Sequence, residues 1–142
     1  DVEAALGAYI QVRQICEKTR TMNTHDGVRL LKNIGMAKHA AGDFEGALDA
    51  HLAERRIRQS LRTLDTLEGA ILLARIGDAK AAQHDQEGAR EAYQEARRVR
   101  ERTSTLNTVE GADVLLQLGN MRGGCGDNAG RLEALTRARQ VR

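Results

Sequence analysis

The sequence predicts an all-α protein built as a solenoid of antiparallel helical hairpins. The composition favours helices: the chain of 142 residues has no proline, 30% charged and only 2% aromatic residues, and many Ala, Leu, Glu and Arg. The sequence also repeats itself with a period of 42 residues, for example in TLEGAILLARIGDAK (66–80) and TVEGADVLLQLGNMR (108–122). A fixed period in this range is typical of a stack of similar supersecondary units.

Three rows of the sequence, beginning at Thr21, Thr63 and Thr105, share this period. Ten columns are identical in all three rows, and in the first row they are Thr21, Thr24, Gly27, Leu31, Gly35, Asp43, Gly46, Ala50, Arg55 and Arg58. We therefore interpret the chain as one solenoid segment, 1–142. It consists of the second helix of a preceding repeat (1–20), two full repeats (21–62 and 63–104) and a truncated repeat (105–142). We expect this segment to belong to a longer array.

Each row predicts two helices joined by a very short link. The first begins after a threonine N-cap, carries an acidic residue in its first turn, and stops near Gly42, His84 or Gly126. The second begins after an aspartate cap and continues to about Ser60 or Arg102. The caps are Thr24, Thr66 and Thr108 for the first helices, and Asp43, Asp85 and Asp127 for the second. Apolar residues on one face of each helix, such as Leu72, Leu73, Ile76 and Ala79, predict the core; in 1–20 they are Ala5, Ala8, Tyr9, Val12 and Ile15.

These rows resemble the tetratricopeptide repeat, in particular the 42-residue variety of kinesin light chains. The resemblance rests on a small residue in the first helix (Gly35, Gly77, Gly119), on alanines and aromatics in the second (Ala47, Ala89, Ala96, Ala138, Phe44, Tyr9, Tyr93) and on the ending ARRVRERT (96–103). It implies a right-handed α-solenoid whose concave groove binds other proteins. The chain departs from the pattern at His51 and Leu135 (an aromatic position) and at Glu54 and Arg131 (alanine positions).

No residue pattern predicts catalysis or a cofactor. The segment MRGGCGDNAGR (121–131) lacks the signature of a phosphate loop, and no strand is predicted before it. The histidines fall at unrelated repeat positions, and Cys16 and Cys125 form no CxxC pair. We therefore expect no enzyme activity, metal or cofactor, and the cysteine usage favours an intracellular reducing compartment, cytoplasmic or organellar. No apolar run approaches the roughly 20 residues that span a membrane.

The resemblance implies a partner-binding groove lined by the first helices. Its residues would be Arg29, Lys32, Asn33 and Met36 in the first row, Ile71, Ala74, Arg75 and Asp78 in the second, and Asp113, Leu116, Gln117 and Asn120 in the third. These positions differ from row to row while the packing positions repeat. Asn33, Arg75 and Gln117 share the position where the family often places an amide that holds a peptide backbone.

Arginines also repeat with the period of the solenoid. Arg13, Arg55, Arg97 and Arg139 form one series, and Arg58, Arg100 and Arg142 form another. Such basic ladders would suit nucleic acid, an acidic protein or lipid head groups. The alternative is a solvated face on which glutamates pair locally with the arginines. A net charge of only +2 and the scarcity of aromatics favour this alternative.

We therefore predict a non-catalytic protein–protein interaction scaffold. It would present a groove to a protein or peptide partner, or serve as a packing arm within a larger assembly. Two alternatives remain open: a regulatory or sensor segment of a multidomain protein, and a binder of nucleic acid or acidic surfaces through the arginines. Gly77 and Gly69 are both interpreted as positions where close packing excludes a larger side chain.

Overall fold

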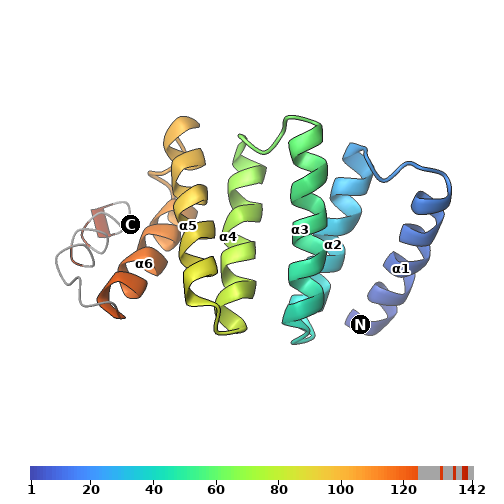
Figure 1. Ribbon diagram of the computed structural model, residues 1–142, viewed down its shortest axis with the longest axis horizontal. Helices are drawn as coiled ribbons and strands as arrows, with labels where there is room; N and C mark the ends of the chain where they lie inside the picture. Colours follow the sequence, from blue (N-terminus) through green and yellow to red (C-terminus); the bar gives the residue numbers. More distant parts are fainter. Residues whose placement is uncertain (125–131, 133–135, 137–138, 141–142) are drawn as a thin grey trace. The chain divides into compact units, whose positions relative to one another are not determined.

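The computed structural model describes residues 1–124 and, beyond them, residues 132, 136, 139 and 140. Six helices and no strand are found in this part of the chain (Figure 1): α1 (Val2–Lys18), α2 (His25–Ala40), α3 (Phe44–Ser60), α4 (Leu67–Ala82), α5 (Gln86–Arg102) and α6 (Val109–Gly124). Of the predicted helix after Asp127, the structure describes only residues 132, 136, 139 and 140, which are helical, and the rest lies outside the described residues. The chain divides into two compact units, 1–64 and 65–142, and each is described by itself.

Side-chain caps explain several of the repeated columns. The hydroxyl Oγ1 of Thr24 accepts a hydrogen bond from the backbone N–H of Gly27 at 3.2 Å, and the Oδ1 of Asp43 accepts one from Gly46 N–H at 2.9 Å. Thr66, Asp85 and Thr108 cap α4, α5 and α6 in the same way. Each cap satisfies an orphan amide at a helix N-terminus. The predicted helix starts are thus confirmed at these five positions.

The hairpin links are tight because one residue in each adopts a left-handed conformation. In the link between α2 and α3 this residue is Gly42, with φ of 81°, and between α4 and α5 it is His84, with φ of 63°. The residue that follows is an aspartate, Asp43 or Asp85. The backbone N–H of Asp43 donates a hydrogen bond of 2.9 Å to the carbonyl of Lys38 in the preceding helix, and that of Asp85 donates one of 3.0 Å to the carbonyl of Lys80. This arrangement closes the C-terminus of the first helix and starts the second. The predicted hairpins are confirmed.

The core of unit 1 lies between α2 and α3. Leu31 and Ile34 are buried against α3, which contributes Ala47, Ala50 and, unexpectedly, two polar side chains, those of His51 and Glu54. Helix α1 packs on α2 but buries none of its residues completely. Val12 and Ile15, which the sequence places on an apolar face, are 44% and 59% exposed.

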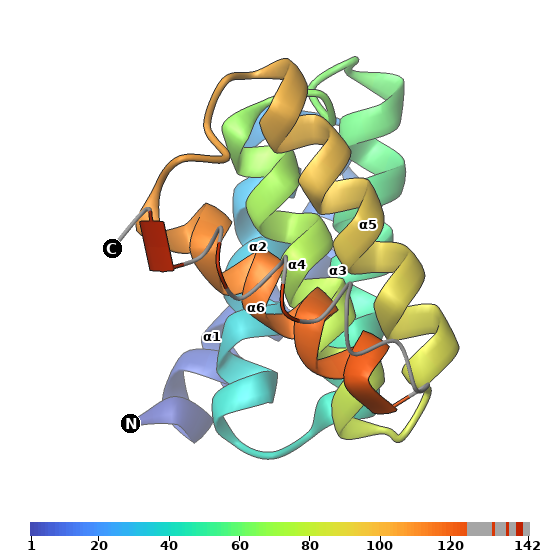
Figure 2. The same ribbon diagram turned by 90° about the vertical axis from the view of Figure 1, so that its left-hand side faces the viewer.

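The core of unit 2 is larger and almost wholly apolar. Helices α4 and α5 form the hairpin, and α6 packs against it, lying obliquely in front of the pair in Figure 2. The buried apolar residues are Ala70, Leu72, Leu73, Ile76 and Ala79 of α4, Ala89, Ala92, Tyr93, Ala96 and Val99 of α5, and Ala112, Val114, Leu115 and Leu118 of α6. The predicted apolar faces of α4 and α5 are therefore confirmed.

In α2 and α4, the repeated glycine in the middle of the helix leaves room for a ring from the helix that follows. A Cβ added to Gly77 would lie 2.6 Å from Cε1 of Tyr93, and one added to Gly35 would collide with the imidazole of His51. Glycine in the first helical turn has a different neighbour: a Cβ on Gly27 or Gly111 would strike the backbone carbonyl of the preceding link. Close packing thus explains why these helices tolerate glycine, whose cost in a helix interior is about 1 kcal/mol.

We predict that Gly77→Ala lowers the free energy of unfolding by about 1–3 kcal/mol, because the methyl group overpacks the buried ring of Tyr93. Gly7→Ala is the matched control, since nothing lies within 4 Å of a Cβ at that exposed position in α1. There the alanine should raise helix stability by about 0.5–1 kcal/mol. Urea unfolding followed by circular dichroism measures both changes. Equal effects of the two substitutions would contradict the packing role of Gly77.

Candidate functional site

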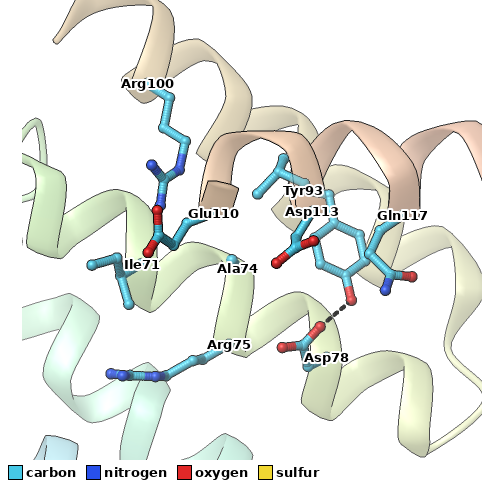
Figure 3. Close-up of a pocket in the computed structure, with 10 residues that line it drawn as sticks. Ile71, Ala74, Arg75, Asp78, Tyr93, Arg100, Glu110, Asp113 and Gln117 are labelled. Carbon is cyan, nitrogen blue, oxygen red and sulfur yellow. Dashed lines mark hydrogen bonds between the residues drawn. The ribbon is translucent and has the colours of Figure 1, made fainter. Parts of the chain in front are cut away.

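Unit 2 contains a cavity of about 330 Å³ between its three helices (Figure 3). Helix α4 contributes Ile71, Ala74, Arg75 and Asp78, helix α5 contributes Tyr93 and Arg100, and helix α6 contributes Glu110, Asp113, Val114 and Gln117. Its wall therefore combines apolar side chains with several charged ones. Ligand pockets span about 300–1,000 Å³ and combine apolar walls with a few polar groups, and this cavity lies at the lower end of that range.

Tyr93 links the floor of the cavity to the core. Its ring packs over Gly77, only 2% of the residue is exposed, and its hydroxyl donates a hydrogen bond to Oδ1 of Asp78 (Figure 3). Burial, and then the hydrogen bond to the carboxylate of Asp78, raise the pKa of Tyr93 well above its usual range. The tyrosine therefore stays a neutral donor at physiological pH, and it orients the carboxylate of Asp78.

Arg100 forms the opposite wall of the cavity. The residue is 1% exposed, and its Nη1 donates hydrogen bonds of 3.2 Å to the backbone carbonyl of Thr105 and to Oγ1 of Thr108. Burial lowers the pKa of Arg100, and the nearby carboxylate of Glu110 opposes that change. Because Thr108 is the N-cap of α6, Arg100 joins the end of α5 to the start of α6. Its Nε is buried and has no hydrogen-bond partner among the described residues.

The charged side chains divide the cavity into two ends. In Figure 3, Asp78, Asp113 and Gln117 lie together near the hydroxyl of Tyr93, whereas Arg75 extends away from them. Glu110 lies at the other end, below Arg100. This end of the cavity, which we call the acidic end, is therefore lined by carboxylates of two helices, α4 and α6.

The structure brings together six of the predicted groove residues at this one cavity: Ile71, Ala74, Arg75, Asp78, Asp113 and Gln117. Gln117 also lines a second cavity of unit 2, of about 460 Å³, together with Asn120.

The groove residues predicted in the first row lie in unit 1. Asn33 and Met36 line a shallow cavity of about 380 Å³ with Tyr9 of α1. Arg29 is exposed and forms an ion pair of 2.8 Å with Asp26, one turn away on α2. Lys32 is half-buried on the same helix and lines none of the three cavities described.

The prediction of two exposed arginine ladders is wrong for one of the two series. Arg58 is 8% exposed and Arg100 only 1%, so neither contributes to a basic surface. In the other series, Arg13 and Arg97 remain on the surface and pair with Glu17 and Glu101 along their own helices, at 2.8 and 3.0 Å. Arg55 is half-buried. Periodicity alone does not separate a structural arginine from a solvated one, because both recur with the fold.

Arg58 is buried because a glutamate accompanies it. Its Nε donates a 2.9 Å hydrogen bond to Oε1 of Glu54, which is itself 1% exposed, and Nδ1 of His51 lies 3.8 Å from the other carboxylate oxygen. Glu54 and His51 are two of the departures from the family pattern, and the structure shows that they pack together. Unit 2 has Ala96 and Tyr93 at the equivalent positions and leaves Arg100 to bond with the link instead.

Sequence reasoning missed four residues of the cavity. Tyr93 and Arg100 belong to a second helix, where only a packing or surface role was expected, and Glu110 and Val114 fall outside the groove positions of the first helix. The sequence gives no signal that separates Arg100 from Arg97, because both belong to columns that are identical in all three rows.

Within the described residues, no group of three or more His, Cys, Asp or Glu side chains could hold a metal ion. The same part of the chain contains no helix that is both long and apolar enough to cross a membrane.

Comparisons with known proteins show the fold. No protein-family model matches the chain, and no curated protein sequence is similar to it. Among solved structures, the crystal structure of BtubC (BKLC) from P. vanneervenii is similar, with a TM-score of 0.88 and 15% identity. The match covers 99% of this chain but 56% of that one, so this chain spans little more than half of its length. The likeness confirms, at the level of the fold, the all-α class and the tetratricopeptide-type helical repeat predicted from the sequence.

We predict that Arg100→Ala lowers the free energy of unfolding by about 2–3 kcal/mol, because two hydrogen bonds to a buried cation are lost and a cavity forms. Arg97→Ala, on the same helix, should change it by less than about 1 kcal/mol, since the exposed pair with Glu101 contributes little. Chemical denaturation of both variants provides the measurement. A larger loss for Arg97 than for Arg100 would contradict the assignment of structural and surface arginines.

Proposed function

We propose that this chain is a protein–protein interaction module and that the cavity of unit 2 receives an extended peptide segment of a partner. One observation carries the proposal: six residues at the groove positions implied by the family resemblance, which differ between repeats, line a single cavity. They are Ile71, Ala74, Arg75, Asp78, Asp113 and Gln117. Binding of a partner is a role that a preformed cavity on a helical repeat can perform without catalytic groups.

The chemistry of the wall supports a peptide as the ligand. Ile71, Ala74 and Val114 offer apolar contact, while the side-chain amide of Gln117 both donates and accepts hydrogen bonds. Such an amide can pair with the N–H and the C=O of an extended backbone. The fixed hydroxyl of Tyr93 holds the adjoining carboxylate of Asp78 in place, so part of the site is organised before a ligand arrives.

Binding of nucleic acid or another acidic surface is the weaker proposal. It depended on two rows of exposed arginines, and the burial of Arg58 and Arg100 removes one of them. Glu17 and Glu101 neutralise part of the other. A role as a regulatory segment of a larger protein is compatible with the same peptide-binding cavity and stays a second proposal.

The proposal is tested by selecting peptides from a random display library on the wild-type chain and measuring their affinity by fluorescence anisotropy. We predict that Ala74→Arg, which fills the cavity from α4, weakens binding of the selected peptides at least tenfold. Ala82→Arg is the matched control: it makes the same change at an exposed position of α4 that does not line the cavity. It should leave affinity within about twofold.

Circular dichroism spectra of both variants show whether the helices are retained. Selected peptides that bind the Ala74→Arg variant as tightly as the wild type would contradict the proposed function.

A further inference from the structure

We propose that the two cavities of unit 2 form one groove, and that a partner peptide places an uncharged side chain in the second of them. The first cavity, of about 330 Å³, is the one in Figure 3, and the second has about 460 Å³. This inference rests on the proposed function, because it extends the site of the same peptide beyond the first cavity. It adds the length of the bound segment and the chemistry of one of its residues.

The two cavities adjoin at the acidic end of the first. Gln117 lies at that end with Asp78 (Figure 3), and its exposed side chain lines both cavities. Along α4, the wall of the second cavity includes Ala81, about one turn after Asp78. Along α6, it includes Asn120, about one turn after Gln117. The groove therefore continues past Gln117 toward the C-terminal ends of these two helices.

The residues that line the groove indicate its length. Ile71 lines the first cavity and Ala81 the second, and they are ten residues apart on α4, which corresponds to about 15 Å along a helix. An extended peptide advances about 3.3 Å per residue, so about five residues span both cavities. Successive side chains of an extended chain point to opposite sides. The two residues that enter the cavities are therefore two or four positions apart.

The wall of the second cavity favours an uncharged side chain. Two apolar residues and three amides line it: Ala81, Met121, Gln86, Gln117 and Asn120. The amides donate and accept hydrogen bonds without carrying charge, and the flexible thioether of methionine adapts to the shape of an occupant.

The two charged residues of this wall compensate each other. Nη2 of Arg90 lies 2.6 Å from Oε1 of Glu87, one turn away on α5, and both residues line the second cavity. A charged side chain of either sign would meet like charge from one member of this pair and would lose part of its hydration in the cavity. An uncharged side chain has neither cost.

Unit 1 has a cavity at the same repeat positions, which is an independent observation. Asn33 and Met36 line it, and they precede Gln117 and Asn120 by two periods of 42 residues. The hollow thus recurs where the second half of a first helix lies beside the start of the helix pair before it. Because the hollow recurs while its side chains change, we infer that it belongs to the repeat and that each repeat sets its own preference.

The test uses the peptides selected on the wild-type chain, with affinity measured by fluorescence anisotropy. We predict that Ala81→Arg, which fills the second cavity from α4, weakens their binding about tenfold or more. Ala82→Arg is the matched control, because it places the same side chain one residue further along α4, at an exposed position that lines neither cavity. It should leave affinity within about twofold.

An alanine scan of the selected peptides gives a second readout on the unchanged chain. We expect two positions, two or four apart, at which alanine weakens binding to the wild type. At one of them the loss should disappear on Ala81→Arg but persist on Ala82→Arg, which assigns that position to the second cavity. Replacing its residue by glutamate or by lysine should in each case weaken binding to the wild type about tenfold or more.

The outcomes separate this inference from the proposed function. If Ala74→Arg weakens binding and Ala81→Arg does not, the peptide occupies the first cavity alone and the inference is wrong. If circular dichroism shows that Ala81→Arg loses its helices, the scan decides, since a single sensitive position would contradict two cavities. A glutamate or lysine that binds as tightly as the selected residue would contradict the uncharged occupant. If no selected peptide responds to Ala74→Arg, the proposed function itself fails.

Discussion

The contact between the central glycine of α2 or α4 and a ring of the helix that follows is the constraint on which the two hairpins depend. In unit 2, Tyr93 lies directly on Gly77, and in unit 1 His51 lies on Gly35. A side chain at either glycine would push the helices apart, and the apolar residues on both sides would lose contact. The close packing of the two helices at the glycine offsets the free-energy cost of placing glycine inside a helix. The same contact fixes the direction of the ring, and in unit 2 it aims the tyrosine hydroxyl at Asp78.

The two hairpins show two solutions to one packing problem. Tyr93, Ala96 and Arg100 in unit 2 correspond to His51, Glu54 and Arg58 in unit 1. Where the alanine becomes glutamate, the arginine turns to it and forms a buried pair; where the alanine remains, the arginine bonds to the link before the next helix. Burying a charged side chain costs free energy unless a partner compensates the charge. Glu54 compensates Arg58 in unit 1, and the link before α6 accepts the hydrogen bond of Arg100 in unit 2.

Much of the fold follows from the sequence, because the features that set it are local and repeated. The caps, the hairpin links and the apolar faces of α4 and α5 each depend on residues close together in the chain. The same sequence pattern therefore recurs in each 42-residue repeat and can be recognised there.

The burial of the repeated arginines could not be predicted in this way. Arg58 and Arg97 both have a glutamate four residues away on their own helix, yet Arg58 is buried and Arg97 only partly so, since burial depends on which helix packs over them. The cavity was predicted only in part: six of its residues lie at the expected groove positions of α4 and α6, whereas Glu110 and Val114 lie at other positions of α6, and Tyr93 and Arg100 reach the cavity from α5.

The central claim is that partners bind at the cavity face of unit 2 rather than along the surface arginines. Nuclear magnetic resonance of the ¹⁵N-labelled chain, titrated with a selected peptide, tests this most directly. The account predicts that the largest shifts occur at the amides of Arg75, Asp78, Asp113 and Gln117, and at the side-chain amide of Gln117. Shifts confined to the amides around Arg13, Arg55 and Arg97, with the cavity residues unchanged, would contradict it.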